Sequence, residues 1–182
     1  NPIGRETKAS VIGINEVMKP HGVLDAFDNM KMQGLAQHIG ITGLGETPAL
    51  IRIIKSNRLA TIQLLYNLLN ASAGISLPSS WSCYNFTGLI DTCFEHDVAV
   101  FGIRAFAAGI LATEKRHGRE QPLTSPDTVA SEEIKQQHLS QALYGNPNPQ
   151  VKLALRFALS QPRIDAIIIG LAERKHLEVA LE

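Results

Sequence analysis

Four short apolar runs, each followed by a segment with helical spacing, constrain the fold of this chain more than any other feature. The runs cover residues 38–42, 60–64, 98–103 and 164–169. Buried strands that alternate with helices predict an α/β fold with a parallel sheet and crossover helices. An open doubly wound sheet and a (β/α)8 TIM barrel both fit this order. A complete barrel takes about 250 residues, so a chain of 182 residues with about four and a half β/α units cannot hold a whole one.

Local signals define the helices between these runs. Apolar residues recur at helical spacing from Gly22 to Gln37, and Gly34 is expected to close that helix. Thr47 is the expected N-cap of the next helix, which places Pro48 at its first position. Further helices are expected over residues 89–96, 131–143, 148 to about 160, and from 174 onward. The third of these has Val151, Leu155 and Leu159 on one face. Residues 65–82 and 114–126 are expected to be loops.

The composition excludes several classes of partner. Seventeen basic and 17 acidic side chains cancel, which argues against a nucleic-acid surface. The apolar runs are far shorter than the roughly 18 residues that a membrane span needs. Cys83 and Cys93 form no CxxC pair, and the six histidines show no metal-ligand spacing. A cytoplasmic protein without a metal site is therefore expected.

Polar residues follow the predicted strands where ligands bind in such folds. They are Thr42-Gly43, Gln63, Arg104 and the turn 170–172. The glycines of the first turn do not make a dinucleotide fingerprint, because Pro48 stands where the third glycine should be. Gln63 lies in an otherwise apolar strand, so its amide needs a partner. The spacing alone leaves open whether that partner is the backbone or a ligand.

Four segments in order carry a resemblance to a known family: HIGITG, IQLLYNLLN, VAVFGIRAFAAGIL and IDAIIIGLAERKHLEVAL. They resemble the last four strand–helix units of the aldo-keto reductases, and the residues GITGL are most similar to the sugar-dehydrogenase-like branch of that family. The resemblance implies that residues 1–182 form the C-terminal half of a single (β/α)8-barrel domain. It also implies an NAD(P)-dependent oxidoreductase that transfers hydride between nicotinamide and a small aldehyde, ketone or sugar.

The family's proton donor is a tyrosine assisted by lysine, aspartate and histidine, all from the first four strands. Asn1-Pro2 matches the residues that follow that histidine, so the resemblance implies that this chain lacks the tetrad and that the fragment alone is inactive. The termini point the same way, because there is no initiator Met and a helical pattern still runs at Glu182. Two alternatives stay open: a non-catalytic half-barrel that binds a nucleotide or a partner, and an unrelated open α/β binding domain.

The resemblance assigns cofactor-binding positions but no catalytic residue. Thr42 and Gly43 match the Ser-Asn pair that holds the nicotinamide carboxamide, and glycine brings no amide. Gln63 matches the family's glutamine on the same carboxamide, and Ile103 stands where many members stack an aromatic ring. The pyrophosphate-side loop is matched by Arg104, Ala105, Phe106 and Gly109, and the segment at the adenosine 2′-phosphate by Gly170, Leu171, Ala172 and His176, with Arg174 nearby.

Two further expectations follow. Basic residues are missing at Gly170 and Ala172, which leaves NAD and NADP both open with a slight preference for NAD. Four strands with two open edges invite pairing with another copy. Self-association is therefore expected of this chain.

Overall fold

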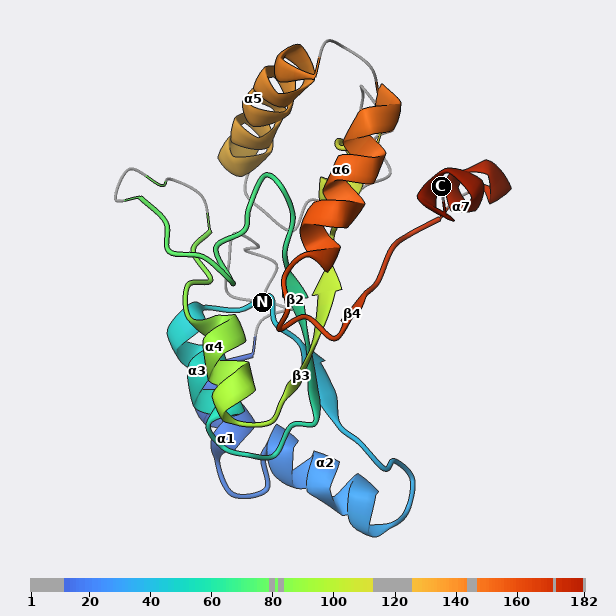
Figure 1. Cartoon of the computed structure of the whole chain (residues 1–182). Coiled ribbons are helices and arrows are strands. Elements are labelled where there is room, and N and C mark those ends of the chain that lie inside the picture. Colours follow the sequence, from blue (N-terminus) through green and yellow to red (C-terminus); the bar gives the residue numbers. More distant parts are fainter. Residues whose placement is uncertain are drawn as a thin grey trace.

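The computed structural model describes residues 12–78, 81, 84–112, 126–143, 147–171 and 173–181, with the side chains of 126–130, 147–149 and 175 left aside. Its centre is a four-stranded sheet in the order β1-β2-β3-β4 (Figure 1). Every neighbouring pair is parallel. The predicted α/β architecture with crossover helices is thereby confirmed.

The four strands lie within the predicted apolar runs but are shorter. They are β1 (Gly40–Thr42), β2 (Thr61–Leu65), β3 (Ala99–Ile103) and β4 (Ala166–Ile167). The largest difference concerns β4, where a run of six residues was expected to be extended and two are paired. A strand is defined by its ladder, and β4 has a described neighbour on one side only.

The helices largely follow the predicted segments. They are α1 (Ile14–Met18), α2 (Val23–Met32), α3 (Thr47–Ile54), α4 (Leu89–Glu95), the 3-10 turn η1 (Ala107–Gly109), α5 (Pro126–Ala142), α6 (Pro147–Leu159) and α7 (Arg174–Leu181). The sequence did not predict α1, and α5 begins five residues before the predicted start. The rest of the expected loop 114–126 lies outside the described residues, as do Asn1, Pro2, Cys83 and Glu182.

The two predicted helix ends have different outcomes. Gly34 closes α2 as expected: its φ is +70°, its N–H bonds to Lys31 O at 2.9 Å, and the N–H of Leu35 bonds to Met30 O at 3.0 Å. These two hydrogen bonds are those of a Schellman motif. The prediction of Thr47 as N-cap is wrong by one residue, because Glu46 occupies that position. The Thr47 hydroxyl instead donates to Asn85 O at 2.7 Å, which ties α3 to the segment before α4.

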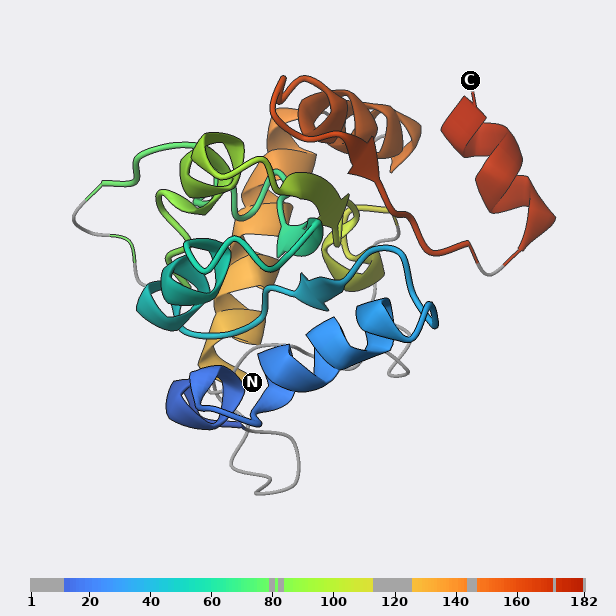
Figure 2. The same cartoon turned by 90° about the horizontal axis from the view of Figure 1, so that it is seen from below.

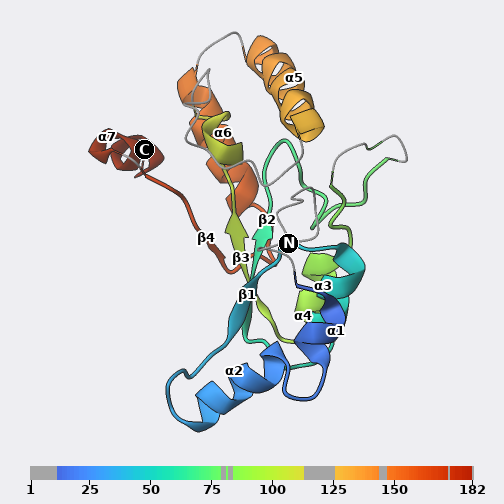
Figure 3. The ribbon, with the colours of Figure 1, turned by 180° about the vertical axis from the view of Figure 1, so that it is seen from behind.

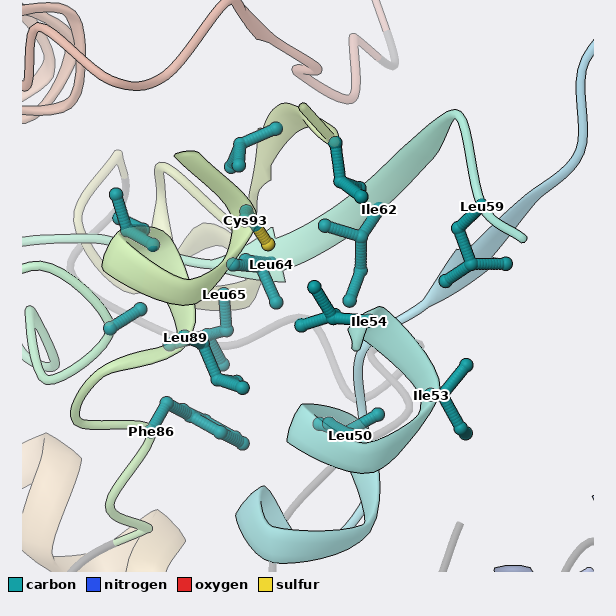
Figure 4. Packing of buried hydrophobic residues seen from close by; sticks show 14 of the residues in the cluster. Leu50, Ile53, Ile54, Leu59, Ile62, Leu64, Leu65, Phe86, Leu89 and Cys93 are labelled. Atoms are coloured by element: carbon teal, nitrogen blue, oxygen red, sulfur yellow. The ribbon is translucent and has the colours of Figure 1, made fainter. Parts of the chain in front are cut away.

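One face of the sheet builds the core. Ile62, Leu64 and Val100 are at most 1% exposed and pack with residues of α3 and α4 (Figure 4). On α3 the fully buried positions are Leu50, Ile53 and Ile54. Ile51 is partly buried and packs at the margin of this core.

The buried face of helix α6 only partly matches the predicted one, because Val151 is buried as expected and Leu155 is half-buried. Val151, Ala154 and Ala158 are buried, whereas Leu159 is 66% exposed. Phe157 stacks on Tyr66, with 5.2 Å between the ring centroids and planes 8° apart. The small alanines let α6 approach the chain that follows β2, so a pattern of large apolar residues did not identify the buried face.

The opposite face of the sheet is more open. The register places Thr61, Gln63, Phe101 and Ile103 there, and each is half-buried. Seen from below, α3, α4 and α6 lie on the core side of the sheet, and no described helix lies against the other face (Figure 2). We call this surface the inner face. No helix among the described residues is long and apolar enough to cross a membrane.

Candidate functional site

Two polar side chains meet where β1 and β2 end. Thr42 and Gln63 are partners in the parallel register, so both point to the inner face. The Thr42 hydroxyl donates to Gln63 Oε1 over 3.4 Å, a long hydrogen bond. No described residue is hydrogen-bonded to Gln63 Nε2, so this half-buried amide keeps donor capacity.

Gly43 completes the end of β1 and has no room for a side chain. Its N–H bonds to Gln63 O at 2.7 Å. A Cβ there would lie 2.6 Å from Leu64 Cδ2, 3.0 Å from Ile62 Cδ1 and 3.1 Å from Gln63 O. A side chain here would displace the end of Leu64 and press on the backbone of β2, so the close packing favours glycine at this position.

An apolar floor continues from this polar pair across the inner face. Phe101 is the register partner of Gln63, and Ile103 is the partner of Leu65 one step closer to the carboxyl end of β3. Neighbouring strands lie about 4.8 Å apart, so these side chains border the Thr42–Gln63 pair. The sequence assigned Ile103 and missed Phe101, although the period of two in a strand places residues 101 and 103 on one face.

The loop after β3 is held by a buried asparagine from the loop after β2. Asn67 is 1% exposed, and its Nδ2 donates to Arg104 O at 2.9 Å. Its Oδ1 accepts from the N–H groups of Leu69 and Asn70, each at 2.9 Å. The two loops are thereby fixed to each other at the carboxyl ends of the strands. The sequence marked Asn67 only as a loop residue.

The predicted pyrophosphate-side loop has an unusual backbone. Arg104, Ala107 and Ala108 have φ values of 62°, 46° and 57°, and Gly109 has 92°. Left-handed conformations cost free energy in residues other than glycine, so the surrounding contacts must hold them. Ala105 and Ala107 are buried, while Arg104, Phe106 and Gly109 are half-buried. Arg104 directly follows Ile103 in the chain, whereas Phe106 packs against the buried cluster that includes Leu69 and Ala107.

The segment after β4 is not brought to these residues. From β4 the chain runs away from the sheet to α7 (Figure 3). Gly170 and Leu171 are exposed, and the Arg174 side chain is 91% exposed and pairs with Glu178 over 3.1 Å. His176 is half-buried, and Ala172 lies outside the described residues. The structure thus gathers Thr42, Gly43, Gln63, Ile103 and the 104–109 loop, and keeps the 170–176 group apart.

The clearest electrostatic perturbations lie away from this site. The Arg58 guanidinium donates hydrogen bonds to Asp25 at 2.6 Å and to Asp28 at 2.7 Å. The hydrogen bond from Arg58 to Asp25 lowers the pKa of Asp25. Burial raises the pKa of the Cys93 thiol to about 12. Within the described ranges, no three His, Cys, Asp or Glu side chains gather as a metal site would require.

A comparison with family models decides what this arrangement belongs to. The Aldo/keto reductase family matches residues 8–182, nearly the whole chain. The chain belongs to the aldo/keto reductase family. This confirms the resemblance read from the four segments, and the family is one of oxidoreductases.

Solved aldo-keto reductase structures share the fold. The holo form of AKR11C1 from Bacillus halodurans superposes with a TM-score of 0.60 at 18% identity, over 88% of this chain and 49% of that one. The apo form gives 0.58 at 19% identity, over 87% and 48%. The chain thus spans about half the length of these aldo-keto reductases and matches part of their barrel. No curated protein matches it significantly.

Proposed function

We propose that this chain supplies the cofactor-holding half of an aldo-keto-reductase-type oxidoreductase, with NAD or NADP as cofactor. The Thr42–Gln63 pair carries the proposal, because two polar groups lie together at the carboxyl ends of β1 and β2 and the Gln63 amide has donor capacity that a polar ligand can use. A small aldehyde, ketone or sugar is the proposed substrate class. The family's chemistry supports it.

The residues present fit a nicotinamide carboxamide. That group offers one N–H donor pair and one carbonyl acceptor, and Gln63 offers the complementary amide while the Thr42 hydroxyl can donate or accept. The long 3.4 Å bond between them is weak enough to be exchanged for ligand contacts. Bound nicotinamide would supply or accept the hydride.

The other residues of the site would orient the cofactor and exclude water. Phe101 and Ile103 provide an apolar surface next to the amide. The 104–109 loop, fixed by Asn67, is the proposed pyrophosphate side. Arg174 is the basic residue that the sequence suggested for a 2′-phosphate, but it lies on α7, away from β2 (Figure 3). We therefore keep NAD as slightly favoured.

Calorimetric titration of the 182-residue chain with NADH and NADPH tests the proposal. Gln63→Ala removes the side-chain oxygen and nitrogen that would hydrogen-bond to the nicotinamide carboxamide. We expect binding to weaken by about 1–2 kcal/mol, or roughly tenfold in affinity. The matched control is Gln37→Ala, because Gln37 is an exposed glutamine before β1. Equal affinities of both variants would show that Gln63 is only a structural residue.

Catalysis needs a separate measurement. With no residue assigned to the tetrad, we expect no carbonyl-dependent oxidation of NADH or NADPH by this chain. Measurable turnover would contradict that assignment. The second candidate is a half-barrel that binds a nucleotide or partner without catalysis, favoured by the half-length match. The residues encoded before Asn1 distinguish the two, since the enzyme requires an Asp, Tyr, Lys and His there.

A further inference from the structure

We propose that Asn67 is a positioning residue of the cofactor site, and that it holds the 104–109 loop in the shape that receives the cofactor's pyrophosphate. This role rests on the proposed function, which assigns that loop to the pyrophosphate. Asn67 touches no cofactor atom in this role. It acts through the backbone of the loop, from the chain that follows β2.

The Asn67 side chain continues the hydrogen bonding between β2 and β3 past the end of the two strands. The N–H of Tyr66 donates to Ile103 O at 3.2 Å. The next carbonyl, Arg104 O, accepts from Asn67 Nδ2 at 2.9 Å. The backbone N–H of Asn67 is engaged elsewhere, because it donates to Asn70 O at 3.1 Å. A side-chain amide therefore takes the place of a backbone donor at the first residue of the loop.

The loop is strained at the residue that Asn67 holds. Arg104 has a φ of 62°, in the left-handed region that residues with a side chain rarely adopt. Its carbonyl also accepts from Ala107 N at 2.8 Å, which closes a turn. Ala107 and Ala108 are left-handed as well, with φ values of 46° and 57°. Such conformations persist where surrounding contacts hold them, and they cluster at ligand-binding sites. The contact from Asn67 fixes the carbonyl at which this turn begins.

Asn67 is itself held in place. Its side chain is 1% exposed, and its Oδ1 accepts from the N–H groups of Leu69 and Asn70, each at 2.9 Å. Leu69 is buried in one apolar cluster with Ala107. The segment around Asn67 thus contacts the loop twice, at Arg104 directly and at Ala107 through Leu69. A loop that is ordered before binding loses less conformational freedom on binding, which raises affinity.

Asn70 offers a matched control three residues away. It is 5% exposed. Its Nδ2 donates to Tyr84 O at 3.0 Å, and its Oδ1 accepts from Ser72 N at 3.1 Å. The same type of side chain is thus buried to nearly the same degree, but it ties the chain to the segment before α4. Loss of Asn70 should destabilise the fold and leave the 104–109 loop unchanged.

Calorimetric titration with NADH and with ADP-ribose, which has the pyrophosphate but no nicotinamide, tests this role. Asn67→Ala should weaken the binding of both ligands by the same factor, about tenfold or more. Asn70→Ala should leave both affinities unchanged, and Gln63→Ala should weaken the binding of NADH alone. Asn67→Ser keeps a short acceptor for the N–H groups of Leu69 and Asn70, but its hydroxyl is one bond too short for Arg104 O. It should therefore lose the same affinity with less loss of stability.

Amide hydrogen exchange adds a measurement without ligand. The N–H groups of Ala107 and Gly109 bond to Arg104 O at 2.8 Å and to Phe106 O at 2.9 Å. Both should exchange faster in Asn67→Ala than in Asn70→Ala. Equal affinities or equal exchange rates in the two folded variants would overturn this role of Asn67 and leave the proposed function standing. If the parent protein binds neither ligand, the proposed function is wrong, and this role falls with it.

Discussion

Replacing Asn67 by alanine should destabilise the chain by about 2–4 kcal/mol. The side chain is 1% exposed and makes three hydrogen bonds of 2.9 Å. Two of its partners keep a second contact: Asn70 N bonds to Asn67 O at 3.1 Å, and Arg104 O accepts from Ala107 N at 2.8 Å. Leu69 N has no other partner among the described residues. One orphaned buried N–H costs about 1–3 kcal/mol, and the lost amide bond to Arg104 adds about 1 kcal/mol.

Urea unfolding followed by circular dichroism measures this loss, with both proteins at the same concentration. The matched control is Asn29→Ala, which removes an exposed asparagine on α2 and should change stability by less than about 0.5 kcal/mol. Asn67→Asp keeps the acceptor for Leu69 and Asn70 but replaces the donor to Arg104. If Asn67→Ala unfolds within about 0.5 kcal/mol of the parent chain, these hydrogen bonds do not hold the two loops.

Two further predictions concern titratable groups. The hydrogen bond from Arg58 lowers the pKa of Asp25 below its ordinary value of 3.8, so its stabilising effect is present above that value and is lost as pH falls through the lower folded-state pKa. The difference in Tm between the parent chain and Asp25→Asn should therefore shrink as pH is lowered from 7 toward 3, and a constant difference would contradict the pairing. Burial raises the pKa of Cys93 to about 12, so in a Cys83→Ser background the thiol should react with a thiol reagent at pH 8 only after unfolding. Rapid reaction of the folded chain would refute its burial.

The sequence predicted the type and order of the elements better than their ends. Apolar runs such as Val98 to Ile103 identify a buried strand, because each residue in them finds a buried or half-buried place in the sheet. The run Ile164 to Ile169 looked as strong but yields a two-residue strand. Pairing depends on a neighbouring strand, and the pattern of one segment contains no information about its neighbour.

The incorrect predictions of a buried helix face and of a helix cap also come from contacts that the local sequence does not contain. Leu159 lies on the face that spacing called buried, yet Ala154 and Ala158 form the contact because α6 packs closely. Thr47 has a good capping side chain, but the carbonyl of Asn85 takes its hydroxyl. Both outcomes are set by residues distant in sequence, which local propensity does not include.

For the site, strand ends were informative and the loops were not. The sequence predicts Thr42 and Gln63 as site residues from their places at the ends of two strands, and the two residues are register partners in the sheet. The role of Asn67 depends on a contact to Arg104, 37 residues away. The assignments of cofactor atoms to individual residues stay predictions.

The tight packing around Gly43 limits how the site could change over generations. A Cβ at this position would meet Leu64 Cδ2 at 2.6 Å and Ile62 Cδ1 at 3.0 Å. An asparagine introduced here alone would strain the end of β1 before it could reach any ligand. The end of the Leu64 side chain would have to turn away, and the backbone oxygen of Gln63, 3.1 Å from the added Cβ, would have to move by a few tenths of an ångström, so any side chain here disturbs the strand that carries Gln63.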